Sequence, residues 1–465
     1  MHRPRSITPA PRRSRPRFAL AARLLAAGFL CWAVAAHAQG YRESLAGEAA
    51  AAGRRTADNG DYNLLLGPIR LKVKASLDVE FNDNVHTAGE GQAKQSDLFL
   101  RPGVSVNASW HITQLNTLSL TLGTSYEFSL NNTREQSVSP FSISPDSRLS
   151  FDLFIGDFRV TFYDAFSLAN NAAQQSAASS TVGFSQFSND FGITVLWDLN
   201  DLVLSAGIDE RSDVFTGRTT QGAGATDLAD ADRETHSLRL SSTFLLSDTT
   251  SAGLQGSAQL SSYSAGAREQ TIFGAGPFAQ FQISPYTRFL VAGGLQLSKS
   301  TGGPSMRATA TLRADPAAAT PFRATVASRD EALPGEKAGT LGYYWSVGIY
   351  NRLNASITHS LTAGHERDFG IAADYEDLDY IRYEATLALF RKASLSGSLG
   401  YERVGQLAGP LQESFTRWTF GLAAGYQLTD HLHAALRYSF YSQDANRADR
   451  IFNQNVVALT LGYDF

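Results

Sequence analysis

Apolar and polar side chains alternate along most of the chain, in segments of roughly ten residues that succeed one another from residue 69 to the C-terminus. In the first segment, residues 69–81, every odd position is apolar and every even position is polar. A period of two is typical of β-strands that have one apolar and one polar face. The sequence therefore predicts an all-β chain.

The connections between these segments alternate in length. Short turns are expected at residues 112–116, 156–157, 198–201, 284–287 and 429–430, and longer polar loops at 131–146, 212–235 and 299–339. Short periplasmic turns and long extracellular loops are typical of outer-membrane barrels, whose apolar face meets lipid. A soluble sandwich has no reason to keep this order. We therefore expect a single antiparallel transmembrane β-barrel with both ends in the periplasm.

The segments amount to about 18 strands, and 16 to 20 strands are compatible with the pattern. An even number returns the chain to the side on which it began. We place them at residues 69–81, 97–110, 116–130, 147–156, 158–169, 187–198, 202–210, 236–246, 251–263, 271–283, 288–298, 341–351, 355–368, 379–390, 394–404, 414–428, 431–442 and 455–465.

The N-terminal region is of a different kind. Residues 1–38 combine an arginine-rich, acid-free start, an apolar run and the tripeptide Ala36-His37-Ala38, which together indicate a cleaved signal peptide. Residues 39–68 are expected to form a short periplasmic or lumen-inserted segment, and residues 69–465 the barrel. A TonB-dependent transporter needs a much longer plug domain before its barrel, so that class is excluded.

Charge and composition exclude several other functions. The signal peptide holds seven of the 40 basic residues and none of the 44 acidic ones, so the mature chain has a net charge of −11, which argues against nucleic acid. The only cysteine, Cys31, lies in the signal peptide. No G-x-S-x-G pattern accompanies the histidines. We expect no enzyme activity, no cofactor and no metal site, and we interpret the acidic residues 227–234 as a solvated loop.

Charged residues on the polar faces are the candidates for lining a pore. They are Arg70, Lys72, Lys74, Arg159, Arg382, Glu384, Arg417 and Arg437. An 18-stranded barrel encloses an aqueous lumen unless something fills it, and facing charges in it would select among solutes. The alternative is that these charges only pair with one another. The long loop 299–339 could also fold inward and narrow the pore.

The final strand carries a further signal. Val457, Leu459, Leu461, Tyr463 and Phe465 alternate with polar or small residues down to a terminal aromatic. This pattern resembles the C-terminal signal that the barrel-assembly machinery recognises as an added strand edge. We expect that machinery to be a partner of the chain.

One stretch resembles a known family. The sequence Phe81-Asn82-Asp83-Asn84-Val85, followed by a polar loop and Asp97-Leu98-Phe99-Leu100-Arg101-Pro102-Gly103, is similar to the opening of a family of porin-like outer-membrane barrels, the porin 2 type. The resemblance implies a link to exopolysaccharide production or export. It supplies no functional residues. On its own chemistry, Asn82-Asp83-Asn84 is a strand-ending turn signal.

The leading functional hypothesis is a porin-like channel of the outer membrane through which small hydrophilic solutes pass passively. The first alternative is an outer-membrane component of exopolysaccharide export or assembly. The second is a closed structural barrel that conducts nothing. The expected partners are outer-membrane lipid and lipopolysaccharide, the assembly machinery, and either solutes or polysaccharide. No sequence feature marks a subunit interface.

Overall fold

The structure is a computed structural model of the chain. The chain divides into two compact units, residues 1–42 and 43–465, and every described residue belongs to the second. The expected signal peptide, residues 39–61 and most of loop 299–339 lie outside the described residues. No helix in the described part is long and apolar enough to cross a membrane. The described residues are 62–131, 139–170, 181–219, 226–227, 232–263, 269–301, 312–314, 322–324, 339–368, 376–390, 392–406 and 414–465.

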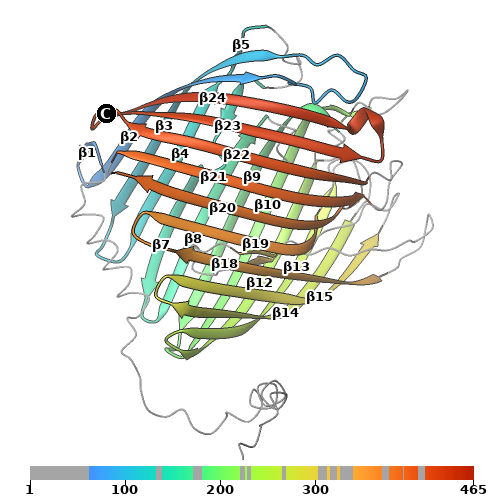
Figure 1. The fold of residues 1–465 in the computed structure, drawn as a ribbon. Helices are drawn as coiled ribbons and strands as arrows, with labels where there is room; N and C mark the ends of the chain where they lie inside the picture. Colours follow the sequence, from blue (N-terminus) through green and yellow to red (C-terminus); the bar gives the residue numbers. More distant parts are fainter. Residues whose placement is uncertain are drawn as a thin grey trace, which may run out of the picture. The chain divides into compact units, whose positions relative to one another are not determined.

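Eighteen antiparallel strands form one closed ring, in which each strand pairs with its neighbours in chain order and β24 pairs with β2 (Figure 1). The ring strands are β2 (Ile69–Asn82), β3 (Asp97–His111), β4 (Thr117–Tyr126), β7 (Arg148–Ile155), β8 (Phe158–Ala169), β9 (Thr181–Asp198), β10 (Leu202–Thr219), β12 (Arg233–Ser247), β13 (Thr250–Tyr263), β14 (Glu269–Ser284), β15 (Thr287–Thr301), β18 (Gly339–Arg352), β19 (Ile357–Asp368), β20 (Glu376–Leu389), β21 (Ala393–Gln406), β22 (Ser414–Gln427), β23 (Leu432–Ala445) and β24 (Phe452–Asp464). The predicted fold class and strand number are confirmed.

The connections alternate in length as the sequence predicts. One end of the barrel carries the tight turns, such as Gly156-Asp157, where Gly156 has a φ of 57°. The other end carries the long connections, so we name the two ends the short-turn end and the long-loop end. The start of β2 and Phe465 both lie at the short-turn end, because Phe465 donates its backbone N–H to Val73. Even strand number and closure together produce this arrangement.

Three regions differ from the sequence expectation. Strands β9 and β10 extend further toward the long-loop end than predicted, so residues 212–219 are strand rather than loop. The strand expected at 116–130 is interrupted at Glu127 between β4 and the short β5 (Phe128–Ser129). The expected loop 131–146 contains a short strand, β6 (Phe141–Ile143), which pairs with the C-terminal end of β4. The remaining short strands are β1 (Leu64–Leu66), β11 (Thr226–Asp227), β16 (Leu312–Ala314) and β17 (Phe322–Ala324).

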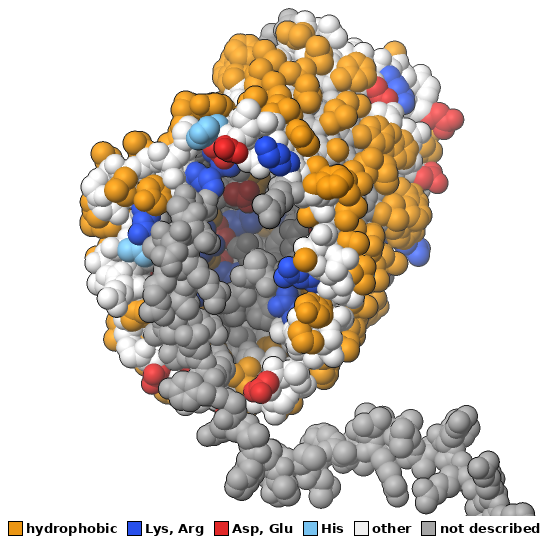
Figure 2. Space-filling view, turned by 60° about the vertical axis from the view of Figure 1, so that its left-hand side comes forward, with side chains coloured by type: hydrophobic (Ala, Val, Ile, Leu, Met, Phe, Trp, Pro, Cys, Tyr) orange, Lys and Arg blue, Asp and Glu red, His pale blue; other side chains and the backbone are white. Residues whose placement is uncertain are grey.

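The two faces of the sheet are distinguished by contacts between strands that are not neighbours. Arg437 on β23 reaches Glu80 on β2, across β24. Gln255 on β13 donates to the hydroxyl of Tyr344 on β18, across β14 and β15. Only the concave side of a closed sheet brings such strands together, so these side chains face inward. The alternate positions face outward, and Figure 2 shows hydrophobic side chains covering much of that surface and charged ones inside the opening.

Strand β1 completes the pairing of β2 at the short-turn end. Strand β24 pairs with β2 only from Lys74 onward, and β1 pairs with Ile69, Arg70 and Leu71 on the same edge. Between the two, the side chain of Asn63 accepts from the backbone N–H of Val73 and donates to its carbonyl, at 2.9 and 2.6 Å. The described part of the segment 39–68 therefore caps the edge of β2 that β24 leaves open.

Candidate functional site: the inward face of the barrel

The eight candidate residues all lie at inward positions of their strands, in register with the inward contacts above. At least four of them form ion pairs: Lys74 with Asp464 at 2.9 Å, Arg159 with Asp152 at 3.1 Å, Arg382 with Glu402 at 2.8 Å and Arg437 with Glu80 at 3.6 Å. At least one side chain of each pair is partly exposed, whereas Glu80 itself is buried. The candidates are spread over five strands and do not form one cluster.

The remaining candidates differ in accessibility. Arg417 is only 2% exposed and donates to the side-chain oxygen of Gln443 at 2.8 Å, so it belongs to the body of the wall. Gln443 in turn donates to the backbone carbonyl of Arg450 in the 3-10 turn η3 (Ala448–Arg450). The guanidinium of Arg70 lies 5.8 Å from the ring centre of Tyr62, near the short-turn end. Glu384 is exposed on β20.

A charged network that sequence reasoning missed lies on β2, β3 and the β4–β5 break. Arg101 forms ion pairs with Glu80 at 2.9 Å and with Glu127 at 2.8 Å, and its guanidinium lies over the ring of Phe99. The break in the strand at Glu127 places that carboxylate beside Arg101. The alternation of inward and outward positions could have identified it, because Glu80 and Arg101 both occupy inward positions of their strands.

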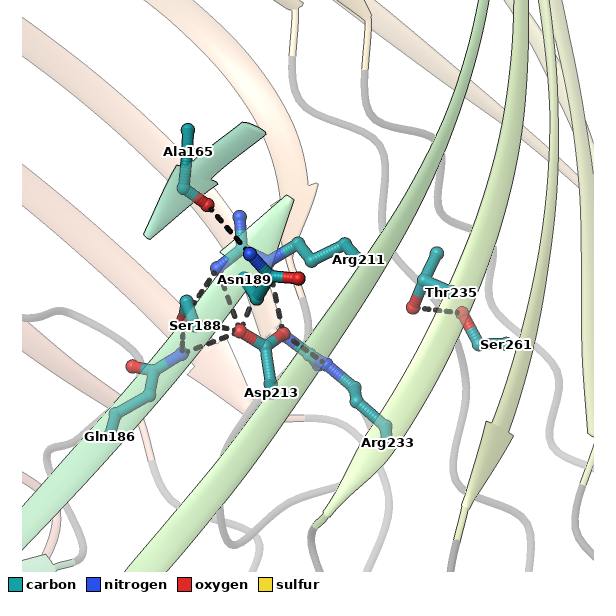
Figure 3. Close-up of polar contacts among 9 residues, drawn as sticks. All are labelled: Ala165, Gln186, Ser188, Asn189, Arg211, Asp213, Arg233, Thr235 and Ser261. Atoms are coloured by element: carbon teal, nitrogen blue, oxygen red, sulfur yellow. Dashed lines mark hydrogen bonds and ion pairs between the residues drawn. The ribbon is translucent and has the colours of Figure 1, made fainter. Parts of the chain in front are cut away.

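A second network lies on β9, β10 and β12, toward the long-loop end (Figure 3). The carboxylate of Asp213, whose side chain is fully buried, accepts from Arg211 and Arg233 at 3.0 Å each. Ser188 and Gln186 on β9 donate to the same carboxylate at 2.6 and 3.1 Å. Asp190 lies opposite Arg211 in the strand pairing, so a second carboxylate is close to the two arginines on this part of the wall.

The turn Asn82-Asp83-Asn84 holds together the seam where the first and last strands of the barrel, β2 and β24, meet. Asn84 is fully buried; its side chain donates to the carbonyls of Ala88 and Asn453 and accepts from the N–H of Ala88. The Asp83 carboxylate accepts from the backbone and side chain of Asn455 at 2.7 and 2.6 Å. The turn signal read from the sequence is thus also a clasp between the β2–β3 loop and β24.

Replacing Asn84 by alanine should lower the free energy of unfolding by about 2–3 kcal/mol, because three hydrogen bonds are lost and buried backbone groups are left unpaired. Urea unfolding of the refolded barrel in detergent micelles measures it. Asp157→Ala, at an exposed position in a tight turn, serves as the control and should change stability by less than about 0.5 kcal/mol. Equal stability of the two variants would contradict the clasp.

Glycines at inward positions allow large side chains to lie along the wall. A Cβ at Gly294 would lie 2.5 Å from the hydroxyl oxygen of Tyr344, and one at Gly276 would lie 2.7 Å from it. Tyr380 lies in the same way over Gly364. These tyrosines therefore lie along the wall of β14, β15 and β19.

The terminal alternation of the chain lies on the outward face. Val457, Leu459, Leu461, Tyr463 and Phe465 are between 39% and 59% exposed, in register with outward positions of β2 and β23. The backbone of β24 is paired on both sides in the closed barrel. The edge that an assembly partner would read is therefore available only before closure.

No protein-family model and no curated protein matches the chain. Solved structures similar to it include a BenF-like porin from Pseudomonas fluorescens Pf-5, with 9% identity, a TM-score of 0.46 and coverage of 85% of this chain and 99% of that one. OccAB1 of Acinetobacter baumannii has 9% identity, a TM-score of 0.45 and coverage of 87% and 98%. OccK2 of Pseudomonas aeruginosa, solved with glucuronate, has 10% identity, a TM-score of 0.43 and coverage of 87% and 100%. These likenesses concern the barrel architecture alone.

Proposed function

We propose that the chain is a channel of the bacterial outer membrane that lets small hydrophilic solutes pass through the barrel. The observation that carries the proposal is that the outer and inner faces of one closed sheet differ in chemistry. The outward positions are mainly apolar and exposed, as lipid requires, and the inward positions are mainly polar or charged, as a water-filled lumen requires.

The size of the barrel supports passage. A barrel of about 18 strands is wide enough for an aqueous lumen. The inward positions of the described strands include many glycines, and two of the inward tyrosines lie flat over glycines. Most of the inward ion pairs lie along the wall between nearby strands. Such a wall takes up little of the interior.

The same proposal includes location and delivery. The chain is exported by its N-terminal signal peptide and inserted into the outer membrane by the barrel-assembly machinery, which reads the pattern from Val457 to Phe465. The short-turn end then faces the periplasm and the long-loop end faces the outside. Lipid and lipopolysaccharide surround the apolar outer surface.

Single-channel recording of the full-length, refolded barrel in a planar bilayer tests the proposal. We expect steady current steps that persist when polysaccharide is added. Current that polysaccharide blocks would favour the exopolysaccharide role implied by the family resemblance. Complete silence from a barrel that circular dichroism shows to be folded would favour the closed structural barrel and refute the channel.

A further inference from the structure

A large recess lies on the inward face near the short-turn end. It has a volume of about 660 Å³ and is formed by β15, β18, β19, β20 and the turn between β14 and β15. Its polar lining includes three arginines, one glutamate, three tyrosines and a row of serines and threonines. It is separate from the Asp213 and Arg101 networks, which lie on other strands.

The pairing register explains why a recess forms here. Strand β19 contributes only small inward side chains, Thr358, Ser360 and Thr362, to the lining. Its neighbours place Tyr350 on one side and Glu384 on the other, both in register with Ser360. A strand of small residues between strands with large ones makes a trough whose floor carries hydroxyl groups.

Positive charge predominates in the trough. Arg288, Arg352 and Arg382 line it with one carboxylate, that of Glu384. Arg382 also pairs with Glu402 at 2.8 Å, and with that second carboxylate included, these described side chains still carry one excess positive charge. A recess with this balance attracts an anion.

Two of the guanidinium groups are held in place by aromatic rings. The guanidinium of Arg288 lies 5.2 Å from the ring centre of Tyr350, and that of Arg382 lies 4.5 Å from that of Tyr380. Stacking of this kind fixes the plane of the guanidinium while its N–H groups remain directed outward from the edges. Planar donors in a fixed orientation suit a carboxylate, which accepts two parallel hydrogen bonds.

We propose that this recess binds small carboxylates that carry several hydroxyl groups, that is, sugar acids, as they pass through the barrel. The inference rests on the proposed channel function and names its preferred solute class. The arginines bind the carboxylate, and the serine, threonine and tyrosine hydroxyls bind the hydroxyls of the solute. The volume falls within the usual range of small-molecule sites, roughly 300–1,000 Å³.

The test compares galacturonate with galactose, which differ only in having a carboxylate or a hydroxymethyl group at one carbon. Both are added to the full-length barrel in a planar bilayer, and the concentration that half-blocks the current is measured. We expect galacturonate to act at a concentration at least about tenfold lower, since a charge-assisted hydrogen bond is worth that factor or more. Equal blocking by the two sugars would overturn the proposal.

Variants locate the effect. Arg288→Gln should weaken the galacturonate block about tenfold and leave the galactose block unchanged, and Arg288→Lys should restore part of it. Arg148→Gln is the matched control. It removes the same charge, but Arg148 faces inward on β7, away from the recess. An equal loss in Arg148→Gln would assign the effect to the general field of the lumen and refute the recess.

The outcomes for the recess and for the channel are separable. Open current without a galacturonate preference leaves the channel function in place and refutes only the recess. If the folded barrel conducts nothing, the channel function fails, and calorimetric titration of galacturonate into the detergent-solubilised barrel still decides the recess. Heat of binding that Arg288→Gln abolishes supports it, and absence of binding in the wild-type barrel overturns it.

Discussion

Leu240→Arg should destabilise the barrel in lipid vesicles by about 2–4 kcal/mol, the cost of an arginine at the midplane of the lipid-facing wall. Leu240 lies in the middle of β12, at an outward position, and is 51% exposed. Its neighbour Ser241 faces inward, in register with Gln255. Ser241→Arg adds the same side chain one residue away on the opposite face, where water can solvate it, and should cost less than about 1 kcal/mol.

Urea unfolding in vesicles of defined lipid composition measures both variants. The comparison tests the assignment of faces directly, because a shift of one residue in register would exchange the two results. Two variants of equal stability, or a less stable Ser241→Arg, would contradict the orientation on which the proposed function depends.

Asp213→Ala should lower the free energy of unfolding by about 3 kcal/mol, because it leaves two arginines beside each other without their shared, buried carboxylate. The lost contacts also include the hydrogen bonds from Ser188 and Gln186. Asp152→Ala is the control, since Asp152 and Arg159 are each 28% exposed. An ion pair that exposed contributes about 1 kcal/mol or less.

The same unfolding measurement in detergent compares Asp213→Ala with Asp152→Ala. Adding Arg211→Met to Asp213→Ala should recover part of the loss, because it removes one of the two facing positive charges. A double variant that is as unstable as the single one would show that packing, not charge, determines the cost of the substitution.

The strands were predictable because a half-lipid, half-water environment imposes alternation on every one of them. Strand β3 was expected at 97–110 and is found at Asp97–His111, and the tight turn that follows it marks its end. The extension of β10 was missed because Arg211 and Asp213 look like loop residues. Both residues continue the alternation of inward positions that includes Asp209. Arg233, the partner that makes burial of Asp213 possible, lies on another strand.

For the candidate site, the sequence predicted only which side of the sheet each residue faces. Alternation places Arg417 and Arg382 on the same side of the sheet, yet Arg417 is buried and hydrogen-bonded to Gln443, while Arg382 lines the recess. Burial depends on which strands are neighbours and on their register, which a single sequence does not contain. The recess depends likewise on the small side chains of β19 lying opposite Tyr350 and Glu384.

The seam between β2 and β24 determines when the barrel can close. The amide of Asn84 contacts the backbone of Asn453, 369 residues further along the chain. During synthesis the free edge of β2 has no partner until the last strand has been made, although hairpins between them can already form. Such a long loop makes closure a single late step with a high entropic cost. A chain that ends before Phe452 retains two open edges, which favours aggregation over a smaller barrel.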